Sequence, residues 1–580
     1  MPSSPESASL ALVLAVSALF AHQIFRKVET LCLPFHVSLL MLPPALVARL
    51  SVSSGRVEWT AFLNRLAFCY VTYIGALAGS IISYRLSPFH PLHRHPGPVW
   101  YRTSILFHAA HMVSGKQTRY LRQLHDTYGD IVRMGPNHLS IRDPSLVGQI
   151  LGPAGIPKGP STLSSHHYDT HVPFIGIQDV EEHSRRRRPW TRGLGPAALK
   201  GYEHIMSRRV HQLVDVLEQQ QGPVALEKWI QYFTYDFMSE MVIGGGFEQL
   251  QNGDSNAIWA TVGKGSQVAT FLGQIPWLGV YLGYIPGITG LLKVLLEYAL
   301  NETTRRLAQG SSTRDLFYYL RNEDLPDEAP PPTRLLLNDG VVGVAAATET
   351  TSTALISVFH CLLVNPEAYA ALQDEVDRFY PQGEDVCNTA SHRAMHYLTA
   401  FVNETLRLFP PVPTNSSRQA PHHSAPVVLG SLVIPPGTQV FVPPYALHHD
   451  ARNFVFPDAF WPDRWLIASG QLPLSLSRLP APAPASESPR GVVEARELDF
   501  DFVHNEAAFM PFSHRPINCA GKALAMQQLR TVVCALVQRF RIRLRLPEGE
   551  KDVARYKEEF EDSYLVANRA ELPVVLEPRW

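Results

Sequence analysis

Cysteine is scarce in this chain, and the few cysteines are scattered without a Cys-x-x-Cys pair. They are Cys32, Cys69, Cys361, Cys387, Cys519 and Cys534. This distribution is typical of a reduced compartment, and it argues against a disulfide framework and against a structural zinc site. An excess of basic charge is also missing, because 51 Lys and Arg face 52 Asp and Glu. The formal net charge of −1 therefore provides no bulk attraction to nucleic acid.

Long apolar runs, by contrast, open the sequence. They cover about Ala8 to Phe25, Leu31 to Ala48 and Leu66 to Tyr84, and a basic residue closes each of them. About 20 helical residues cross a hydrocarbon core of ~30 Å, so each run has nearly the length of a transmembrane helix. Basic residues flank both sides of the runs, so they do not decide the orientation in the membrane.

Two of these runs have a second interpretation. The first resembles in length a cleaved secretory signal, but the residues before it contain Glu6 and no Lys or Arg, which argues against a signal. The second is also compatible with a buried or re-entrant segment, because Pro34, Pro43 and Pro44 interrupt it. The third has only small and apolar residues between its arginines, which favours a span.

The composition changes after the third run. Four prolines between residues 88 and 98 form a stiff connector. We therefore expect a membrane-anchoring region at residues 1–87, with up to three transmembrane helices, and a globular domain at residues 88–580. In that domain helical patterns dominate residues 196–380, a hairpin is predicted around Pro136-Asn137, and a strand-rich patch runs from Val427 to Val442.

The Pro-, Ala- and Ser-rich residues 472–490 predict a mobile surface loop. No internal repeat is present. The sequence thus predicts a mainly α fold with small β-sheets, preceded by N-terminal transmembrane helices.

The stretch from Phe512 to Ala525 places one cysteine in a loop that continues directly into a helix. Pro516 restricts the backbone ahead of Cys519, and Gly521 allows a close backbone approach behind it. From Lys522 onward, apolar residues recur at helical spacing. Unpaired N–H groups at a helix start favour a thiolate. Three roles remain open for such a thiolate: an inert core cysteine, a nucleophile or a metal ligand.

This stretch resembles the haem-binding loop of the cytochrome P-450 family, written F-x-x-G-x-R-x-C-x-G. Phe512, Cys519 and Gly521 stand in register with that motif. The resemblance implies that they bind haem b and that Cys519 is the axial thiolate ligand of the iron. Two positions depart from the motif. Arg515 replaces Gly, and Ile517 replaces the Arg that usually pairs with a haem propionate.

A second pair of motifs lies upstream. Glu404 and Arg407 stand at i and i+3, so they share a helix face. As a generic helix ion pair this would be weak and common. With Arg464 in the segment from Phe460 to Trp465, it resembles the family's E-x-x-R helix and its P-E-R-F-type element. The resemblance implies a buried Glu404–Arg407–Arg464 triad that holds the core and the haem loop.

Residues 341–351 resemble the family's oxygen-activating helix, with the pattern A/G-G-x-D/E-T. Ala346, Ala347, Glu349 and Thr350 fill the pattern, and Ala replaces the middle Gly. Small residues let a helix lie close to a flat cofactor, and the resemblance implies that Glu349 and Thr350 are catalytic and deliver protons to bound oxygen. The alternative is a polar cluster inside a core helix.

Four consecutive arginines, residues 185–188, are usually a solvated face or a patch for nucleic acid or anionic lipid. The family often has W-x-x-x-R here to hold haem propionates, and His183 and Arg187 fall at that spacing. The resemblance therefore implies propionate contacts from His183, Arg187 and also Arg418. The remaining arginines would face an acidic redox partner.

Taken together, the motifs imply a monooxygenase that inserts one oxygen atom from O2 into a lipophilic substrate. A terpenoid or other specialised metabolite is expected, because the candidate substrate-facing residues are mostly apolar. These residues are Ala346, Val412, Pro413, Thr414 and Asn415. Electrons would come from NADPH through NADPH-cytochrome reductase, with cytochrome b5 as a further partner and no nucleic acid. The expected location is the endoplasmic reticulum membrane, with the catalytic domain in the cytosol.

Two other interpretations remain open from the sequence. One is a reductase-independent family member that isomerises a substrate or rearranges a peroxide, and the acid–alcohol pair argues against it. The other is a degenerate membrane protein without haem, which only Arg515 and Ile517 support.

Overall fold

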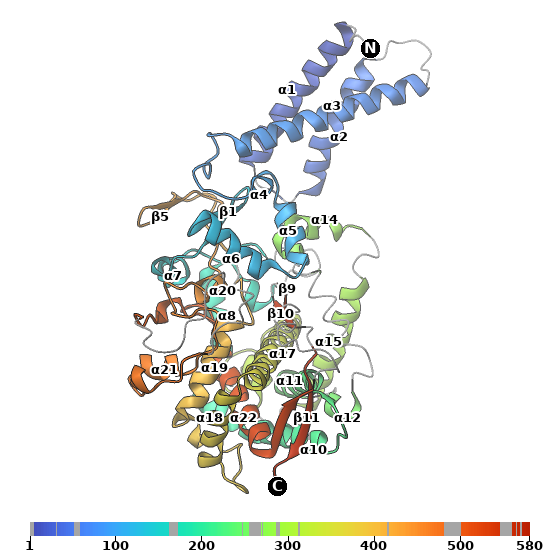
Figure 1. Ribbon diagram of the computed structural model, residues 1–580. Coiled ribbons are helices and arrows are strands. Elements are labelled where there is room, and N and C mark those ends of the chain that lie inside the picture. Colours follow the sequence, from blue (N-terminus) through green and yellow to red (C-terminus); the bar gives the residue numbers. More distant parts are fainter. Residues whose placement is uncertain are drawn as a thin grey trace.

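The structure is a computed structural model of the chain (Figure 1). It describes residues 5–28, 30, 32–51, 59–161, 172–245, 248–253, 268, 271–285, 290–310, 314–414, 417–480, 500–545, 560–563, 565–568 and 571–580.

Three N-terminal helices stand apart from the rest of the molecule (Figure 1). They are α1 (Pro5–Lys27), α2 (Leu33–Leu50) and α3 (Trp59–Leu86), and each is long and apolar enough to cross a membrane. Helix α2 continues through Pro43 and Pro44 without a break. The three helices bury a small core of their own around Leu14 and Tyr73, and the Tyr73 hydroxyl donates to the Leu39 carbonyl at 2.7 Å. These features are those of a membrane anchor.

The anchor is tied to the globular part where α3 ends. Arg133 is fully buried, and its Nη2 atom donates to the Arg85 carbonyl at 3.1 Å and to the Pro136 carbonyl at 2.9 Å. A Cβ at Gly97 would lie 2.2 Å from the Arg133 carbonyl oxygen, so only glycine permits this close approach of the connector. The connector is therefore packed on the domain and holds the end of α3 in place.

The globular part is built mainly of helices. In chain order they are α4 (Val99–Thr103), α5 (Ile105–Val113), α6 (Gln117–Tyr128), α7 (Pro144–Leu151), α8 (Val180–Gly193), α9 (Pro196–Gly201), α10 (Glu203–Glu218), α11 (Leu226–Ile243), α12 (Gln249–Asn252), α14 (Pro276–Leu282), α15 (Gly290–Gln309), α16 (Leu316–Leu320), α17 (Thr333–Val364), α18 (Pro366–Phe379), α19 (His396–Leu408), α20 (Pro444–His448), α21 (Asp463–Ala468) and α22 (Lys522–Arg539). Helix α17 runs through the centre and packs against α11, α19 and α22 (Figure 1).

Helix α17 also has the length and hydropathy of a membrane span, but its burial explains its composition differently. Its second half is enclosed by other elements of the domain, and Leu355, Val358 and Phe359 are almost completely buried there. A helix that is apolar on all sides fits the middle of a large domain as well as a bilayer. The apolar composition of α17 therefore reflects its central position.

The strands form small sheets. In chain order the strands are β1 (Ile131–Gly135), β2 (His138–Ile141), β3 (Val224–Ala225), β4 (Arg418–Gln419), β5 (Val427–Leu429), β6 (Leu432–Ile434), β7 (Gln439–Phe441), β8 (Phe540–Leu544), β9 (Phe560–Ser563), β10 (Leu565–Asn568) and β11 (Pro573–Pro578). One sheet has the order β1-β2-β7-β4 and another β3-β11-β8, while β5–β6 and β9–β10 are two-stranded.

Pairing of the strands confirms the predicted hairpin around Pro136-Asn137, with Ile131 opposite Ile141. The patch from Val427 to Val442 does contain strands, but they belong to two sheets. Strand β7 pairs in parallel with β2, and β5 pairs only with β6 among the described residues. Most of the predicted loop at residues 472–490 lies outside the described residues, and its beginning includes the short helix η4 (Leu474–Leu476).

Candidate functional site

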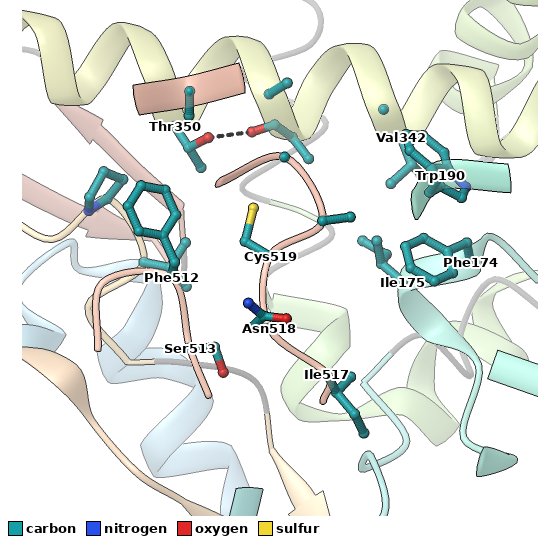
Figure 2. A pocket seen from close by; sticks show the side chains of 18 of the residues that line it. Phe174, Ile175, Trp190, Val342, Thr350, Phe512, Ser513, Ile517, Asn518 and Cys519 are labelled. Atoms are coloured by element: carbon teal, nitrogen blue, oxygen red, sulfur yellow. Dashed lines mark hydrogen bonds between the residues drawn. The ribbon is translucent and has the colours of Figure 1, made fainter. Parts of the chain in front are cut away.

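A cavity of about 600 Å³ lies between the middle of α17, helix α8 and the loop that precedes α22 (Figure 2). Its walls are mostly apolar, and Phe174, Ile175, Met238, Val342 and Leu406 contribute to them. This volume falls within the range of about 300–1,000 Å³ that is typical of ligand and cofactor sites. The cavity is therefore the candidate active site.

Cys519 projects its sulfur into this cavity toward α17 (Figure 2). The backbone N–H of Cys519 donates to the Phe512 carbonyl at 3.0 Å, which closes the loop on itself. Arg187 of α8 holds the neighbouring residue, since Nη1 donates to the Asn518 carbonyl at 2.8 Å and Nη2 to Asn518 Oδ1 at 3.0 Å. The loop that carries the thiol is thus held by the hydrogen bond between Cys519 and Phe512 and by the contacts of Arg187 with Asn518.

The electrostatics of Cys519 differ from the sequence-based expectation. Burial raises the pKa of this thiol, and the N–H groups of Gly521 and Lys522 together with the Arg187 and Lys522 charges only partly oppose that effect. The groups at the start of α22 do favour the thiolate, as expected. Desolvation of the sulfur is the larger effect, so the pKa of the Cys519 thiol lies above its ordinary value.

Helix α17 faces the sulfur across the cavity with small residues. Ala346, Ala347 and Thr350 line it, and the Thr350 hydroxyl donates to the Ala346 carbonyl at 2.6 Å (Figure 2). Glu349 is not among the lining residues, and burial raises the pKa of its carboxyl group to about 7. At neutral pH this carboxyl group can both hold and release a proton, which is the property required of an acid–base group.

Basic side chains gather at one edge of the cavity, called here the cationic edge. His183, Arg187 and Lys158 line it, and the backbone of Lys158 forms a β-bridge with Arg418. Burial, followed by the Arg418 and Arg187 charges, lowers the pKa of Lys158 to about 7. Burial and the same cations with Lys158 also lower the pKa of His183 to about 4. His183 is therefore neutral and Lys158 only partly charged at neutral pH, and an anion at this edge would favour their protonated forms.

The cavity fits a haem on these observations. The Nε2 atom of His183 is buried without a hydrogen-bond partner, although Phe174 stacks on the ring at 4.9 Å. A buried polar atom without a partner is costly, and a carboxylate at this edge would satisfy it. The sulfur at the cavity floor, the small residues opposite and the cations at one edge match an iron, a flat ring and its propionates.

Lys158 was missed by the sequence analysis. It is a single lysine between Pro157 and Gly159, and no motif distinguishes it. Only the β-bridge to Arg418 brings it to the same edge as Arg187.

The arginine run does not form one solvated face, which corrects part of the prediction. Arg185 and Arg188 are exposed, but Arg186 is buried and both of its bonds to the Asp339 carboxylate of α17 measure 2.7 Å. Each residue of an α-helix points about 100° further around the axis than the one before it, so four adjacent arginines of α8 cannot share a side. Arg186 therefore cannot face a redox partner, and it joins α8 to α17 beside the cavity.

The predicted triad is assembled in the interior. Glu404 is fully buried and accepts hydrogen bonds from Arg407 at 2.8 and 2.9 Å and from Arg464 at 3.1 Å. The Trp461 N–H and the Trp465 indole N–H complete its shell at 2.9 and 3.0 Å. Burial alone would raise the pKa of Glu404, but the two arginines outweigh it and lower the pKa to about 2.

The predicted substrate-facing residues divide into three groups. Ala346 and Val412 line the cavity. Pro413 and Thr414 are not among its lining residues, and Asn415 lies outside the described residues. Among the described residues after the proline turn, Val412 and Ser417 therefore reach the cavity.

Comparison with known proteins agrees with this geometry. The family model described as Cytochrome P-450 matches residues 95–560. The chain is similar to the cytochrome P-450 monooxygenase FCK2 of Fusarium pseudograminearum, with 29% identity over 88% of this chain and 86% of that protein. It is similar to the tryprostatin B 6-hydroxylase of Neosartorya fischeri, with 27% identity over 88% and 86% of the two chains. It is also 28% identical to the cytochrome P-450 monooxygenase phqL of Penicillium fellutanum, over 81% and 78%.

Proposed function

This chain belongs to the cytochrome P-450 family of haem-thiolate monooxygenases, and from that premise we propose that Cys519 ligates the haem iron of a membrane-anchored enzyme. The observation that carries the proposal is the Cys519 sulfur, which points into a cavity opposite the small residues of α17. When bound, the haem supplies the redox-active iron at which dioxygen is activated. The protein supplies the ligand, the propionate partners, the protons and the shape of the substrate site.

The residues that would hold the haem come from three parts of the chain. Cys519, Phe512 and Gly521 belong to the loop before α22, His183 and Arg187 to α8, and Arg418 to β4. Lys158 joins them at the cationic edge. In the family's haem-binding loop an arginine usually stands at the position of Ile517. We propose that the cationic edge takes over the role of that arginine, because two propionate carboxylates placed there would offset the repulsion among its positive charges.

The residues that would hold and move protons beside the haem lie on α17. The Thr350 hydroxyl lies in the cavity wall, and Glu349 is the adjacent residue. The raised pKa of Glu349, about 7, lets this carboxyl group release a proton and take another from water at physiological pH. We propose Glu349 as the proton reservoir and Thr350 Oγ1 as the group that positions the proton.

The substrate would be a lipophilic specialised metabolite. The cavity walls away from the cationic edge are apolar, which favours a substrate with few charges. The name of the tryprostatin B 6-hydroxylase describes the oxidation of a specialised metabolite by a similar chain. We propose hydroxylation of a compound of this broad class, and a terpenoid is one kind of molecule that such a cavity would accept.

The family and the N-terminal helices support a proposal for the electron donors and for the cellular location of the enzyme. We propose that NADPH-cytochrome reductase, with cytochrome b5 as a second donor, reduces the enzyme at the endoplasmic reticulum membrane from the cytosolic side. The exposed Arg185 and Arg188 provide cationic groups for an acidic partner.

A carbon-monoxide difference spectrum of reduced microsomes tests for haem-thiolate, and NADPH-dependent product formation tests the electron source. A haem-free, folded protein would refute the proposal.

The Thr350→Ala variant tests proton delivery, because it removes one hydroxyl and keeps the helix. We expect NADPH consumption to continue while product falls and hydrogen peroxide rises. Acid–base groups contribute about 100- to 10,000-fold, and water that replaces the hydroxyl would reduce the loss. The measurement is peroxide released per NADPH oxidised. Thr353→Ala, a buried threonine of the same helix that does not line the cavity, is the control. Equal ratios in wild type and Thr350→Ala would remove Thr350 from the mechanism.

The Lys158→Met variant tests the cationic edge. Methionine keeps the length of the side chain and removes the charge, so we expect faster loss of haem to an excess of apomyoglobin. If Lys158 compensates for the missing loop arginine, the additional change Ile517→Arg should restore haem retention in the same chain. Lys116→Met, at an exposed lysine, is the matched control. Unchanged haem loss in Lys158→Met would show that this lysine does not contact the propionates.

Truncation tests the anchor. A chain that starts at Tyr84 and one that starts at Pro88 both lack the membrane helices, and we expect both to leave the membrane fraction with haem bound. Only the first retains the Arg85 carbonyl that accepts a hydrogen bond from Arg133. Loss of this partner for a buried donor costs about 1–3 kcal/mol, so the shorter chain should unfold at lower temperature. Full retention of both in the membrane would reveal a second membrane contact.

A further inference from the structure

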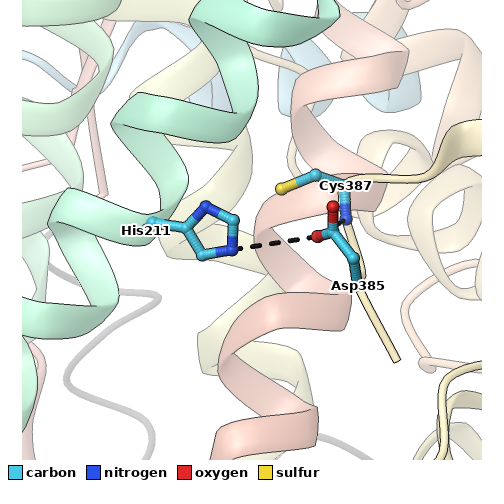
Figure 3. Close-up of side chains that lie close together, drawn as sticks. All are labelled: His211, Asp385 and Cys387. Carbon is cyan, nitrogen blue, oxygen red and sulfur yellow. Dashed lines mark hydrogen bonds and ion pairs between the residues drawn. The ribbon is translucent and has the colours of Figure 1, made fainter. Parts of the chain in front are cut away.

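Three potential metal ligands meet at a position that the proposed function does not use. His211 of α10 and Asp385 and Cys387 of the segment after α18 place their ligand atoms within 4.8 Å of one another (Figure 3). His211 Nε2 lies 3.8 Å from Asp385 Oδ1. We propose that these residues form a zinc site that joins α10 to this segment.

The set of donor atoms suits Zn²⁺. Zinc combines imidazole nitrogen, thiolate sulfur and carboxylate oxygen at about 2.0–2.3 Å in a tetrahedral arrangement. Two ligands on one tetrahedron are therefore roughly 3–4 Å apart by the same geometry. The His211–Asp385 separation of 3.8 Å lies within this range, and all three ligand atoms lie within 4.8 Å of one another, so small rotations of the exposed His211 and Asp385 side chains would close the site. A water molecule would occupy the fourth position.

Neighbouring hydrogen bonds already orient two of the three ligands. Ser207 Oγ lies 3.3 Å from His211 Nδ1, which directs Nε2 toward the other ligands. Asp385 Oδ1 accepts a hydrogen bond from the Cys387 backbone N–H at 2.9 Å, which holds the turn that carries both residues. Outer contacts of this kind are typical of histidine and carboxylate ligands in metal sites.

The alternative is a surface ion pair beside a core cysteine. In the metal-free protein burial raises the pKa of Cys387 to about 12, so the thiol is protonated and metal binding must displace that proton. The position of Cys387 argues for a ligand nevertheless. Cys387 is buried, and the ligand atoms of the exposed His211 and Asp385 lie close to its sulfur (Figure 3).

The consequence would be structural. The segment after α18 leads through η3 (Thr389–Arg393) into α19, which carries Glu404 and Arg407. A metal that fixes Asp385 and Cys387 to α10 would hold the start of this connection. Since the ligands come from distant parts of the chain, no motif in the sequence could predict the site.

The test is titration of the chelator-treated, haem-loaded full-length protein in detergent with zinc chloride, followed by calorimetry. Haem loading keeps the Cys519 thiol from binding zinc. We expect one zinc per chain in wild type, none in His211→Ala or Cys387→Ser, and an affinity about 10- to 100-fold lower in Ser207→Ala. His204→Ala, an exposed histidine of α10, and Cys361→Ser are the matched controls and should still bind one zinc.

X-ray absorption at the zinc edge gives an independent measurement. We expect one sulfur at about 2.3 Å and nitrogen or oxygen ligands at about 2.0–2.2 Å. Wild type that binds no zinc, or binding that His211→Ala and Cys387→Ser leave unchanged, would overturn the proposal. If Cys387→Ser does not fold, His211→Ala decides alone, because this side chain is exposed.

Discussion

Replacement of Cys519 by serine is expected to abolish the long-wavelength carbon-monoxide band that distinguishes haem-thiolate proteins. The Cys519 sulfur lines the cavity and points toward α17 (Figure 2). A serine hydroxyl is a poor ligand for iron and cannot donate charge as a thiolate does. Monooxygenase activity should fall to background, because a haem held here would lose the thiolate ligand that supports its oxidative chemistry.

Two further measurements make this result specific. Total haem, measured after extraction, separates loss of the ligand from loss of the cofactor, since the cationic edge and the cavity walls remain. Cys534→Ser, at a buried cysteine of α22, should keep the band. A normal band in Cys519→Ser would show that another residue ligates the iron.

Replacement of Glu404 by glutamine is expected to remove most of the folded protein. The carboxylate balances two fully buried guanidinium groups, those of Arg407 and Arg464. Removal of one partner from a buried ion pair costs about 3–5 kcal/mol, because charge is left without compensation. Since whole domains are stable by only about 5–15 kcal/mol, we expect low yield and loss of haem-bound protein at growth temperature.

The chain contains a matched control for this experiment. Glu182 and Arg185 stand at the same i, i+3 spacing with a separation of 2.8 Å, but Arg185 is exposed. Exposed pairs contribute about 0–1 kcal/mol, so Glu182→Gln should leave the midpoint of thermal unfolding nearly unchanged. Similar midpoints in both variants would refute the structural role of the triad.

The same carboxylate predicts a dependence on acid. Because the folded-state pKa of Glu404 is about 2 and its ordinary value is 4.5, its contribution to stability is complete above the ordinary value and declines as pH falls toward 2. The difference in stability between wild type and Glu404→Gln should therefore shrink as pH is lowered below about 4.5.

The sequence predicted the site best where a few neighbouring residues carry the information. The predictions for the loop around Cys519, the Ala346–Thr350 stretch of α17 and the Glu404–Arg407 pair each depend on spacing within one element. In the structure Cys519, Ala346 and Thr350 line one cavity, and Arg407 donates a hydrogen bond to Glu404. Hairpin turn residues and helical periodicity are local in the same way. This is why the mainly helical fold and the anchor helices could be predicted.

Charge was less predictable, since the state of an ionisable group depends on what surrounds it. The start of α22 suggested a thiolate at Cys519, yet burial by distant elements raises its pKa. Likewise the four arginines of residues 185–188 look equivalent in the sequence. Only the packing of α17 beside α8 gives Arg186 a buried carboxylate partner, that of Asp339.

What the sequence determined by itself is therefore the order of the elements and the chemistry that each can offer: an apolar anchor, a cysteine loop, an acid–alcohol helix and an E-x-x-R pair. The tertiary structure alone decided which charges meet. It brings Lys158 to Arg418, and it brings His211 to Asp385 and Cys387. The physical reason is that desolvation and Coulomb interaction act through space, whereas spacing along the chain constrains only residues that share one helix, strand or turn.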